Sequence, residues 1–201
     1  MADGQLLLDP PVEPRLIDAD EFLLMVEAGV FADEERKIEL DDGRIVVAPM
    51  DGPAHLSVGE RLGAIWYPKW AADSALQARL KLYIPGGVRL GKRMARAPDA
   101  MLAPPGIVEK GRWPTAREAL LAVEFSDTTL KYDDGKKRQD YARGGLAELW
   151  IVRVEHQDVR VCRGPRDDGS WDEADLHAGD AIITPLAAPA LALRVRDLFA
   201  D

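Results

Sequence analysis

The chain has 201 residues, of which 47% are hydrophobic and 30% charged, a composition typical of one ordinary globular domain with a sizeable core. Its formal net charge of −9 argues against a general polyanion binder, because affinity for nucleic acid depends largely on neutralising phosphates. No apolar run is long enough to cross a bilayer, and the N-terminus lacks the basic start and apolar core of a signal peptide. The single cysteine, Cys162, cannot form an internal disulfide, which fits a reducing cytoplasm.

The first elements follow a proline-rich opening. Residues 1–17 are expected to form a flexible lead-in to one domain spanning residues 18–201. Asp18 or Asp20 can cap a helix that runs to about Ala28, because a side-chain oxygen accepts from the free N–H groups of the first turn.

The next segments alternate between strand and helix patterns. A β-hairpin turn is indicated by the Asp-Gly pair inside RKIELDDGRIVVAP. The helical spacing of apolar residues predicts a helix from Pro53 to about Trp70. We expect a strand at LQARLKLYI, a Gly-rich, basic loop directly after it, and a short strand at APDAMLAP.

The second half of the chain begins with ALLAVEF, which is nearly all apolar and predicts a central strand covered on both faces. Asp133 or Asp134 can cap the helix that follows. A second hairpin is predicted by LAELWIVRV and DVRVCRG, with short strands after it. The sequence therefore predicts an α/β single domain in which a mixed, twisted β-sheet is flanked by helices.

One basic stretch stands out against the acidic average. No acidic residue lies between Asp73 and Asp99. A local basic surface can bind phosphates even on an acidic protein, and a solvated, arginine-rich loop is the alternative interpretation. The candidate nucleic-acid contacts in this stretch are Arg89, Lys92, Arg93 and Arg96.

Two carboxylates indicate a metal site. Glu124 lies inside the predicted central strand, where lost hydration is costly unless a cation or a donor compensates it. Asp99 follows Pro98 at the start of a neighbouring strand. Two such carboxylates can hold a hard divalent cation. The alternatives are a structural ion pair with an arginine, or exposure at the strand end.

Five further residues could complete such a site, and each has an ordinary structural alternative. Lys136 and Lys137 lie on the first turns of the helix after the central strand. There a lysine can reach the carboxyl end of that strand, and the alternative is a solvated helix face. Tyr141 lies one turn beyond Lys137, on the same face. Glu39 in the first hairpin is a third carboxylate or an exposed one, and His55 is a ligand or a core histidine.

The order of these segments resembles a known family. The segments are IELDDGRIVVAPMDGPAH, APDAMLAP and LLAVEFSDTTLKYDDGKKRQDYARGGLAELWIV, within residues 18–155. They resemble the Uma-type restriction-endonuclease family of the PD-(D/E)xK nuclease superfamily, and the last segment is the most specific. The resemblance implies a restriction-endonuclease-like fold.

The resemblance also implies roles for individual residues. Asp99 and Glu124 match the metal-binding carboxylates, with the Phe125 carbonyl as a further ligand, and Lys137 matches the family's lysine. Upstream, Glu39 and His55 match a family glutamate and histidine. The chain departs from the wider superfamily at the E-x-K position, Glu124-Phe125-Ser126, where the strand has no lysine.

The function implied by the resemblance is that of a cytoplasmic, homodimeric DNA endonuclease that uses Mg²⁺ or Mn²⁺ to hydrolyse phosphodiester bonds. Two other hypotheses remain open. A protein of the same fold could bind nucleic acid or regulate without useful catalysis, as the net acidity and the missing strand lysine suggest. A structural or assembly protein is the third hypothesis.

Overall fold

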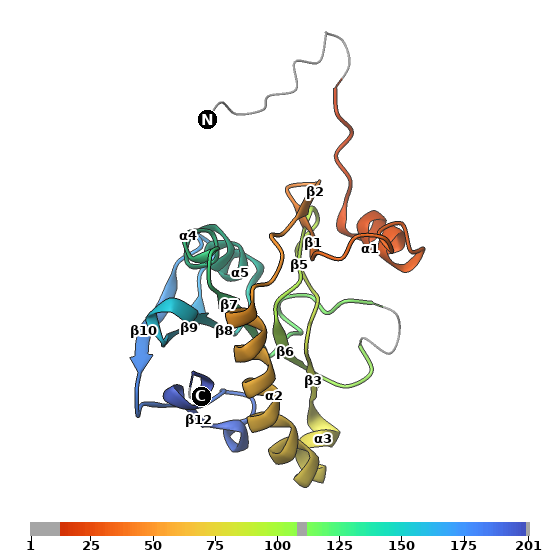
Figure 1. The fold of residues 1–201 in the computed structure, drawn as a ribbon. Coiled ribbons are helices and arrows are strands. Elements are labelled where there is room, and N and C mark those ends of the chain that lie inside the picture. Colours follow the sequence, from red (N-terminus) through yellow and green to blue (C-terminus); the bar gives the residue numbers. More distant parts are fainter. Residues whose placement is uncertain (1–12, 108–111, 200–201) are drawn as a thin grey trace.

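A six-stranded sheet runs through the centre of the molecule and carries most of its core (Figure 1). The computed structural model of the chain describes residues 13–107 and 112–199. The order in the sheet is β10-β9-β8-β7-β6-β3, and β7 is parallel to β8 while the other neighbours are antiparallel. The strands are β3 (Lys81–Tyr83), β6 (Ala100–Ala103), β7 (Leu121–Ser126), β8 (Glu148–Arg153), β9 (Asp158–Pro165) and β10 (Trp171–Ala178).

The central strand β7 is buried along its whole length, as the apolar sequence predicts. Successive side chains of a strand point to opposite faces, so its apolar residues serve two separate cores. Leu121, Val123 and Phe125 belong to the larger core, whereas Ala122 belongs to the smaller one. The alternation places Glu124 on the same face as Ala122.

Helices cover both faces of this sheet (Figure 1). The larger core is covered by α2 (Pro53–Ala72), whose Trp66 packs against Trp150 and donates to the Leu191 carbonyl at 2.8 Å. The opposite face packs against one helical run that contains a π-helical turn. That run consists of α4 (Leu130–Tyr132), η2 (Asp133–Lys137) and α5 (Arg138–Gly144).

The C-terminal segment consists of short pieces that pack beside α2. It contributes Ile183, Leu191 and Val195 to the larger core. Its elements are β11 (Ile182–Ile183), η4 (Pro189–Leu191), β12 (Leu193–Arg194) and η5 (Val195–Leu198), and η3 (Val154–His156) connects β8 to β9. No helix in the described ranges is both long and apolar enough to cross a membrane.

A second, four-stranded sheet lies beside the first and has the order β2-β1-β5-β4. The predicted first hairpin is confirmed, and Asp42 and Gly43 in its turn have φ of 48° and 77°. Helix α1 (Ala19–Glu27) packs on this sheet through Phe22, and Asp18 accepts from the Glu21 N–H at 2.9 Å as its cap. The strands are β1 (Ile38–Asp41), β2 (Arg44–Val47), β4 (Val88–Gly91) and β5 (Met94–Arg96).

Three local predictions differ from the structure. Asp73 accepts from the Leu76 N–H at 2.9 Å and caps α3 (Ser74–Arg79), so only the end of the predicted strand at LQARLKLYI is extended. The predicted basic loop contains the hairpin β4–β5 instead. The helix expected to begin at Asp133 or Asp134 begins at Leu130, because the Asp133 carboxylate is held by Ser126 and Thr129 instead of capping.

The predicted lead-in lies mostly outside the described residues, since residues 1–12 are not among them. The Ile17 N–H donates to the Gly43 carbonyl at 3.0 Å, so the last residue of the predicted lead-in already packs on the first hairpin. The division into a lead-in and one domain from residue 18 stays a prediction.

The first hairpin depends on Gly43, and Gly43→Ala tests that dependence. A Cβ there would lie 2.9 Å from the Leu16 Cβ and 3.0 Å from the Ile17 carbonyl oxygen, at a φ that side chains rarely adopt. Gly29 has a φ of 73° and nothing within 4 Å of the added Cβ. We expect Gly29→Ala to cost about 1 kcal/mol of unfolding free energy, and Gly43→Ala about 1–3 kcal/mol more. Equal losses in urea denaturation would contradict the packing argument.

Candidate functional site

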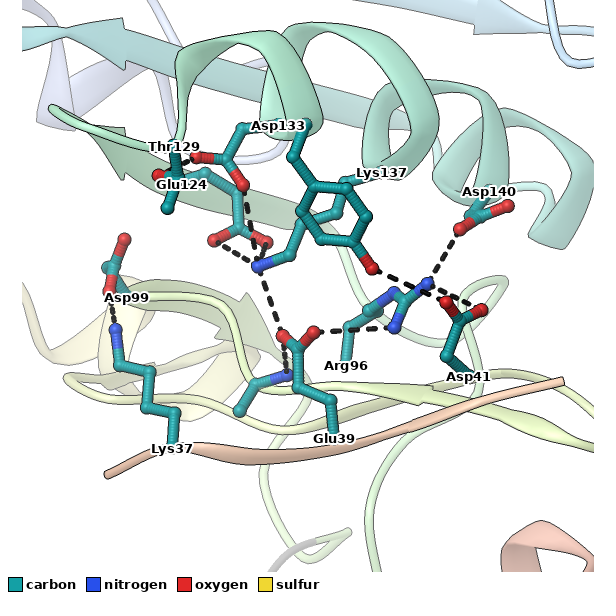
Figure 2. A network of polar contacts seen from close by, with 12 residues as sticks. Lys37, Glu39, Asp41, Arg96, Asp99, Glu124, Thr129, Asp133, Lys137 and Asp140 are labelled. Atoms are coloured by element: carbon teal, nitrogen blue, oxygen red, sulfur yellow. Dashed lines mark hydrogen bonds and ion pairs between the residues drawn. The ribbon is translucent and has the colours of Figure 1, made fainter. Parts of the chain in front are cut away.

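Charged side chains from distant segments meet where the first hairpin faces the central strand and the helical run (Figure 2). They line a cavity of about 230 Å³ between the first hairpin, the start of α2 and the carboxyl end of β7. The predicted residues that line it are Glu39, His55, Asp99, Glu124, Phe125 and Lys137. The structure therefore brings all the expected catalytic and metal-site residues together.

Asp99 is held at the start of β6 by the neighbouring strand. It is 5% exposed, and its Oδ2 accepts from the Phe125 N–H at 2.5 Å. The antiparallel register pairs Ala100 with Val123, which sets Asp99 beside Glu124. The other oxygen, Oδ1, contacts Lys37 and His55. One carboxylate oxygen is thus fixed by the backbone, and the other one faces the cavity.

Glu124 is almost completely buried, on the face of β7 that meets the helical run. The Tyr141 hydroxyl donates to its Oε1 at 2.7 Å, and the Lys137 Nζ lies 3.4 Å from both of its oxygens. Burial raises the pKa of Glu124 to about 7, which the Lys137 ammonium only partly offsets. Burial next to this carboxylate also raises the pKa of Tyr141, so its hydroxyl remains a donor.

Three carboxylates share the ammonium of Lys137. Its Nζ lies 3.1 Å from Glu39 Oε1, 3.4 Å from Glu124 and 3.6 Å from Asp133 Oδ1. Burial acts to lower the pKa of Lys137, but the carboxylates outweigh it and the pKa is raised. A raised lysine pKa and a raised Glu124 pKa agree with each other, because negative charge is in excess around one cation. Lys137 therefore stays charged, and Glu124 is the group that takes up a proton.

Glu39 is held rather than free. Its Oε1 also accepts from the Ala97 N–H at 3.1 Å, and its Oε2 accepts from Arg96 at 3.3 Å. With both oxygens engaged and only 2% of the residue exposed, Glu39 links Lys137 to Arg96. This geometry suits positioning the lysine better than binding a cation.

Arg96 is not part of a basic surface. It is completely buried, and its guanidinium pairs with Glu39, Asp41 and Asp140. Because these partners already occupy it, Arg96 is not available to a phosphate, and the expectation that it contacts nucleic acid is not kept.

The other three predicted phosphate contacts lie on the β4–β5 hairpin. Lys92 and Arg93 are exposed at its turn, and Arg89 pairs with Asp20 at 2.7 Å. Their role in binding nucleic acid stays a prediction.

His55 lies on the first turn of α2, between the cavity and the core. Its Nε2 lies 3.0 Å from Asp99 Oδ1 and 3.4 Å from Asp51 Oδ1. Its ring packs edge-on against Phe125, with centroids 5.4 Å apart. Burial lowers the pKa of His55, although Asp51 and a hydrogen bond to the Phe125 backbone act in the opposite direction. Asp51, His55 and Asp99 offer three ligand atoms within 4.8 Å of one another.

Sequence reasoning missed Lys37, Asp51 and the roles of Asp41 and Asp133. Lys37, Glu39 and Asp41 alternate along the first hairpin strand, so they share one face. Asp51 precedes His55 by four residues, and Asp133 precedes Lys137 by four, the spacing of neighbours on a helix surface. These spacings were visible in the sequence, but the partners across the cavity were not.

The burial of Glu124 predicts a pH effect on stability. A carboxyl whose pKa is raised from 4.5 to about 7 on folding stabilises the fold below pH 4.5, and this stabilisation is lost as the pH rises through 7. Glu124→Gln mimics the protonated form. We compare the unfolding free energies of the variant and the native chain in metal-free buffer. The difference, variant minus native, should be about 1–3 kcal/mol more positive at pH 8 than at pH 5. Glu173→Gln, which alters an exposed carboxyl on β10, is the control, and an unchanged difference would contradict the burial argument.

Comparison with known proteins agrees with this geometry. Curated protein sequences give no match. A crystal structure described as "a putative nuclease belonging to DUF820", from Anabaena variabilis, is similar with a TM-score of 0.66 and 19% identity, over 82% of this chain and 90% of that chain. This likeness confirms the fold class. Residues 19–196 match the profile of the family Uma2, described as "Putative restriction endonuclease", and the chain therefore belongs to that family.

Proposed function

We propose that this protein is a metal-dependent DNA endonuclease that hydrolyses phosphodiester bonds. The observation that supports this most is the contact between Lys137 and Glu124 beside Asp99. A buried pair of carboxylates and a lysine thus meet at the end of β7. The lysine comes from the helical run, and the strand itself has Ser126 where a lysine is expected. Family membership and the nuclease-like fold point in the same direction.

The donor set fits a hard divalent cation such as Mg²⁺ or Mn²⁺. Asp99 and Glu124 supply carboxylate oxygens, and the carbonyl of Phe125, the residue after Glu124, is a further candidate oxygen ligand. Carboxylates outnumber cations around the cavity, and the pKa of Glu124 is raised mainly by burial and further by the neighbouring Asp133 and Glu39. A divalent cation held there would supply positive charge to the phosphate and would acidify water at neutral pH.

The protein's own residues would orient and stabilise. Lys137 remains an ammonium at any working pH, so it acts as a donor and a positive charge toward the phosphate and the attacking water, not as a base. The Phe125 N–H fixes Asp99, and Tyr141 fixes Glu124. Held in this way, both carboxylates keep their positions without reorganisation during the reaction.

Nucleic acid as the substrate, the contacts of Arg89, Lys92 and Arg93 with its backbone, a homodimer and a cytoplasmic location remain parts of this proposal. A basic hairpin at the edge of the second sheet could bind phosphates although the whole chain is acidic.

Cleavage of supercoiled plasmid DNA tests the activity. We expect nicking with Mg²⁺ or Mn²⁺ and none in the presence of a chelator. Asp99→Asn and Glu124→Gln should each lower the rate by about 100-fold or more, because each removes a carboxylate charge from the proposed metal site. The control is Glu173→Gln, at an exposed position on β10. If both site variants cleave as fast as the native chain, the assignment is wrong. Salt-sensitive DNA binding without turnover would instead favour a non-catalytic binding protein.

The lysine assignment has a matched control within the chain. Lys137 is buried against Glu124, whereas its neighbour Lys136 is 45% exposed and pairs with Asp41 and Asp140. We expect Lys137→Met to lower plasmid cleavage by about 100-fold, and Lys136→Met to leave it within a few-fold. Circular dichroism and melting curves check that both variants fold. Loss of cleavage in Lys136→Met alone would show that the wrong lysine has been assigned.

A further inference from the structure

A second group of ligand atoms, from Asp51, His55 and Asp99, lines both this cavity and a neighbouring one of about 610 Å³ that Lys137 does not line. Asp51 precedes α2, His55 lies on its first turn, and Asp99 directly precedes β6, so the group joins the beginnings of two elements that are distant in sequence. Asp51 takes no part in the function proposed above.

The spacing of these atoms suits one metal ion. His55 Nε2 lies 3.0 Å from Asp99 Oδ1 and 3.4 Å from Asp51 Oδ1. Adjacent ligands of an octahedral ion, each bound at about 2.1 Å, lie about 3 Å apart. The two measured separations are close to this value, and all three ligand atoms lie within 4.8 Å of one another.

The imidazole has the environment of a metal-binding histidine. Its ring is hydrogen-bonded to the Phe125 backbone. When Nδ1 carries the ring proton, Nε2 presents a lone pair to two carboxylate oxygens, and three acceptors facing one another need a cation. A backbone partner on the other ring nitrogen is what fixes the tautomer of many metal-bound histidines.

A cation from the protein itself already occupies this place. The Lys37 Nζ contacts Asp99 Oδ1 and lies 3.6 Å from Asp51 Oδ2. Its side chain is 21% exposed, compared with 9% for Lys137, so it can swing out without unpacking the core. The site attracts positive charge, and the Lys37 ammonium that now lies there can be replaced by a metal ion.

We propose that Asp51, His55 and Asp99 form a second cation site, which prefers a transition-metal ion such as Mn²⁺ to Mg²⁺, and that Lys37 neutralises the site until the ion binds. The preference follows from the donor set, since imidazole suits transition metals whereas Mg²⁺ takes oxygen ligands. The site shares Asp99 with the cation of the proposed nuclease reaction and so deepens that function.

Mn²⁺ binding to the metal-free full chain tests the proposal without any cleavage assay. We expect two ions per chain by electron paramagnetic resonance of free Mn²⁺, with one of them retained under a large excess of Mg²⁺. The retained ion should show ¹⁴N coupling in pulsed spectra, and that coupling should disappear in His55→Gln. Absence of nitrogen coupling in the native chain would overturn the proposal. This measurement does not depend on whether any variant folds.

Variants separate this site from the nuclease site. Asp51→Asn should abolish the Mg²⁺-resistant ion, whereas Glu124→Gln should abolish only the displaceable one. Lys37→Met should tighten the Mg²⁺-resistant ion by about tenfold or more, because a competing cation is removed. An unchanged ion count in Asp51→Asn contradicts the proposal. If the chain cleaves plasmid DNA but shows no nitrogen coupling, only the second cation site is wrong. If it shows nitrogen coupling but no cleavage, only the proposed nuclease activity is wrong.

Discussion

The shared ammonium of Lys137 is the interaction on which the arrangement of the two sheets depends. It joins Glu39 of the second sheet, Glu124 of the central strand and Asp133 of its own helical run. Each carboxylate is buried, and an unpaired charge in such a place is strongly destabilising. The hairpin can therefore pack on the helical run only in the register that presents Glu39 to the lysine. A structural requirement and the proposed catalytic site coincide at one residue.

The first hairpin strand, with Lys37 before it, presents a charged face to the helical run and to the residue that precedes β6 (Figure 2). Lys37, Glu39 and Asp41 are two residues apart and contact, in turn, Asp99, Lys137 and Lys136. A one-residue slip of this strand would turn all three side chains to the other face and break these ion pairs. Electrostatics thus sets the geometry on this side of the cavity, while apolar packing sets it beneath the central sheet.

The sequence predicted the parts of the site that local patterns determine. A glutamate in an apolar run is buried wherever that run is a central strand, and an aspartate opening the neighbouring strand lies beside it. Arg96 was misplaced because its burial depends on Glu39, Asp41 and Asp140, which are distant in sequence and have no local signal. The choice between Lys136 and Lys137 also depends on a π-helical turn, which changes the phase of the helix and is not visible in apolar spacing.

Ser126, at the strand position where the resemblance to the wider superfamily leads to the expectation of a lysine, is itself connected to Lys137. Ser126 Oγ donates to Asp133 Oδ2 at 2.8 Å, and Asp133 Oδ1 lies 3.6 Å from the Lys137 Nζ. A lysine on the strand would need no such link, because its own backbone would position it. A lysine on a helix does need one, and the serine and aspartate supply it from the strand side. A polar chain from Ser126 through Asp133 thus reaches the buried Lys137, so the strand helps to hold the lysine against Glu124 although the lysine belongs to the helical run.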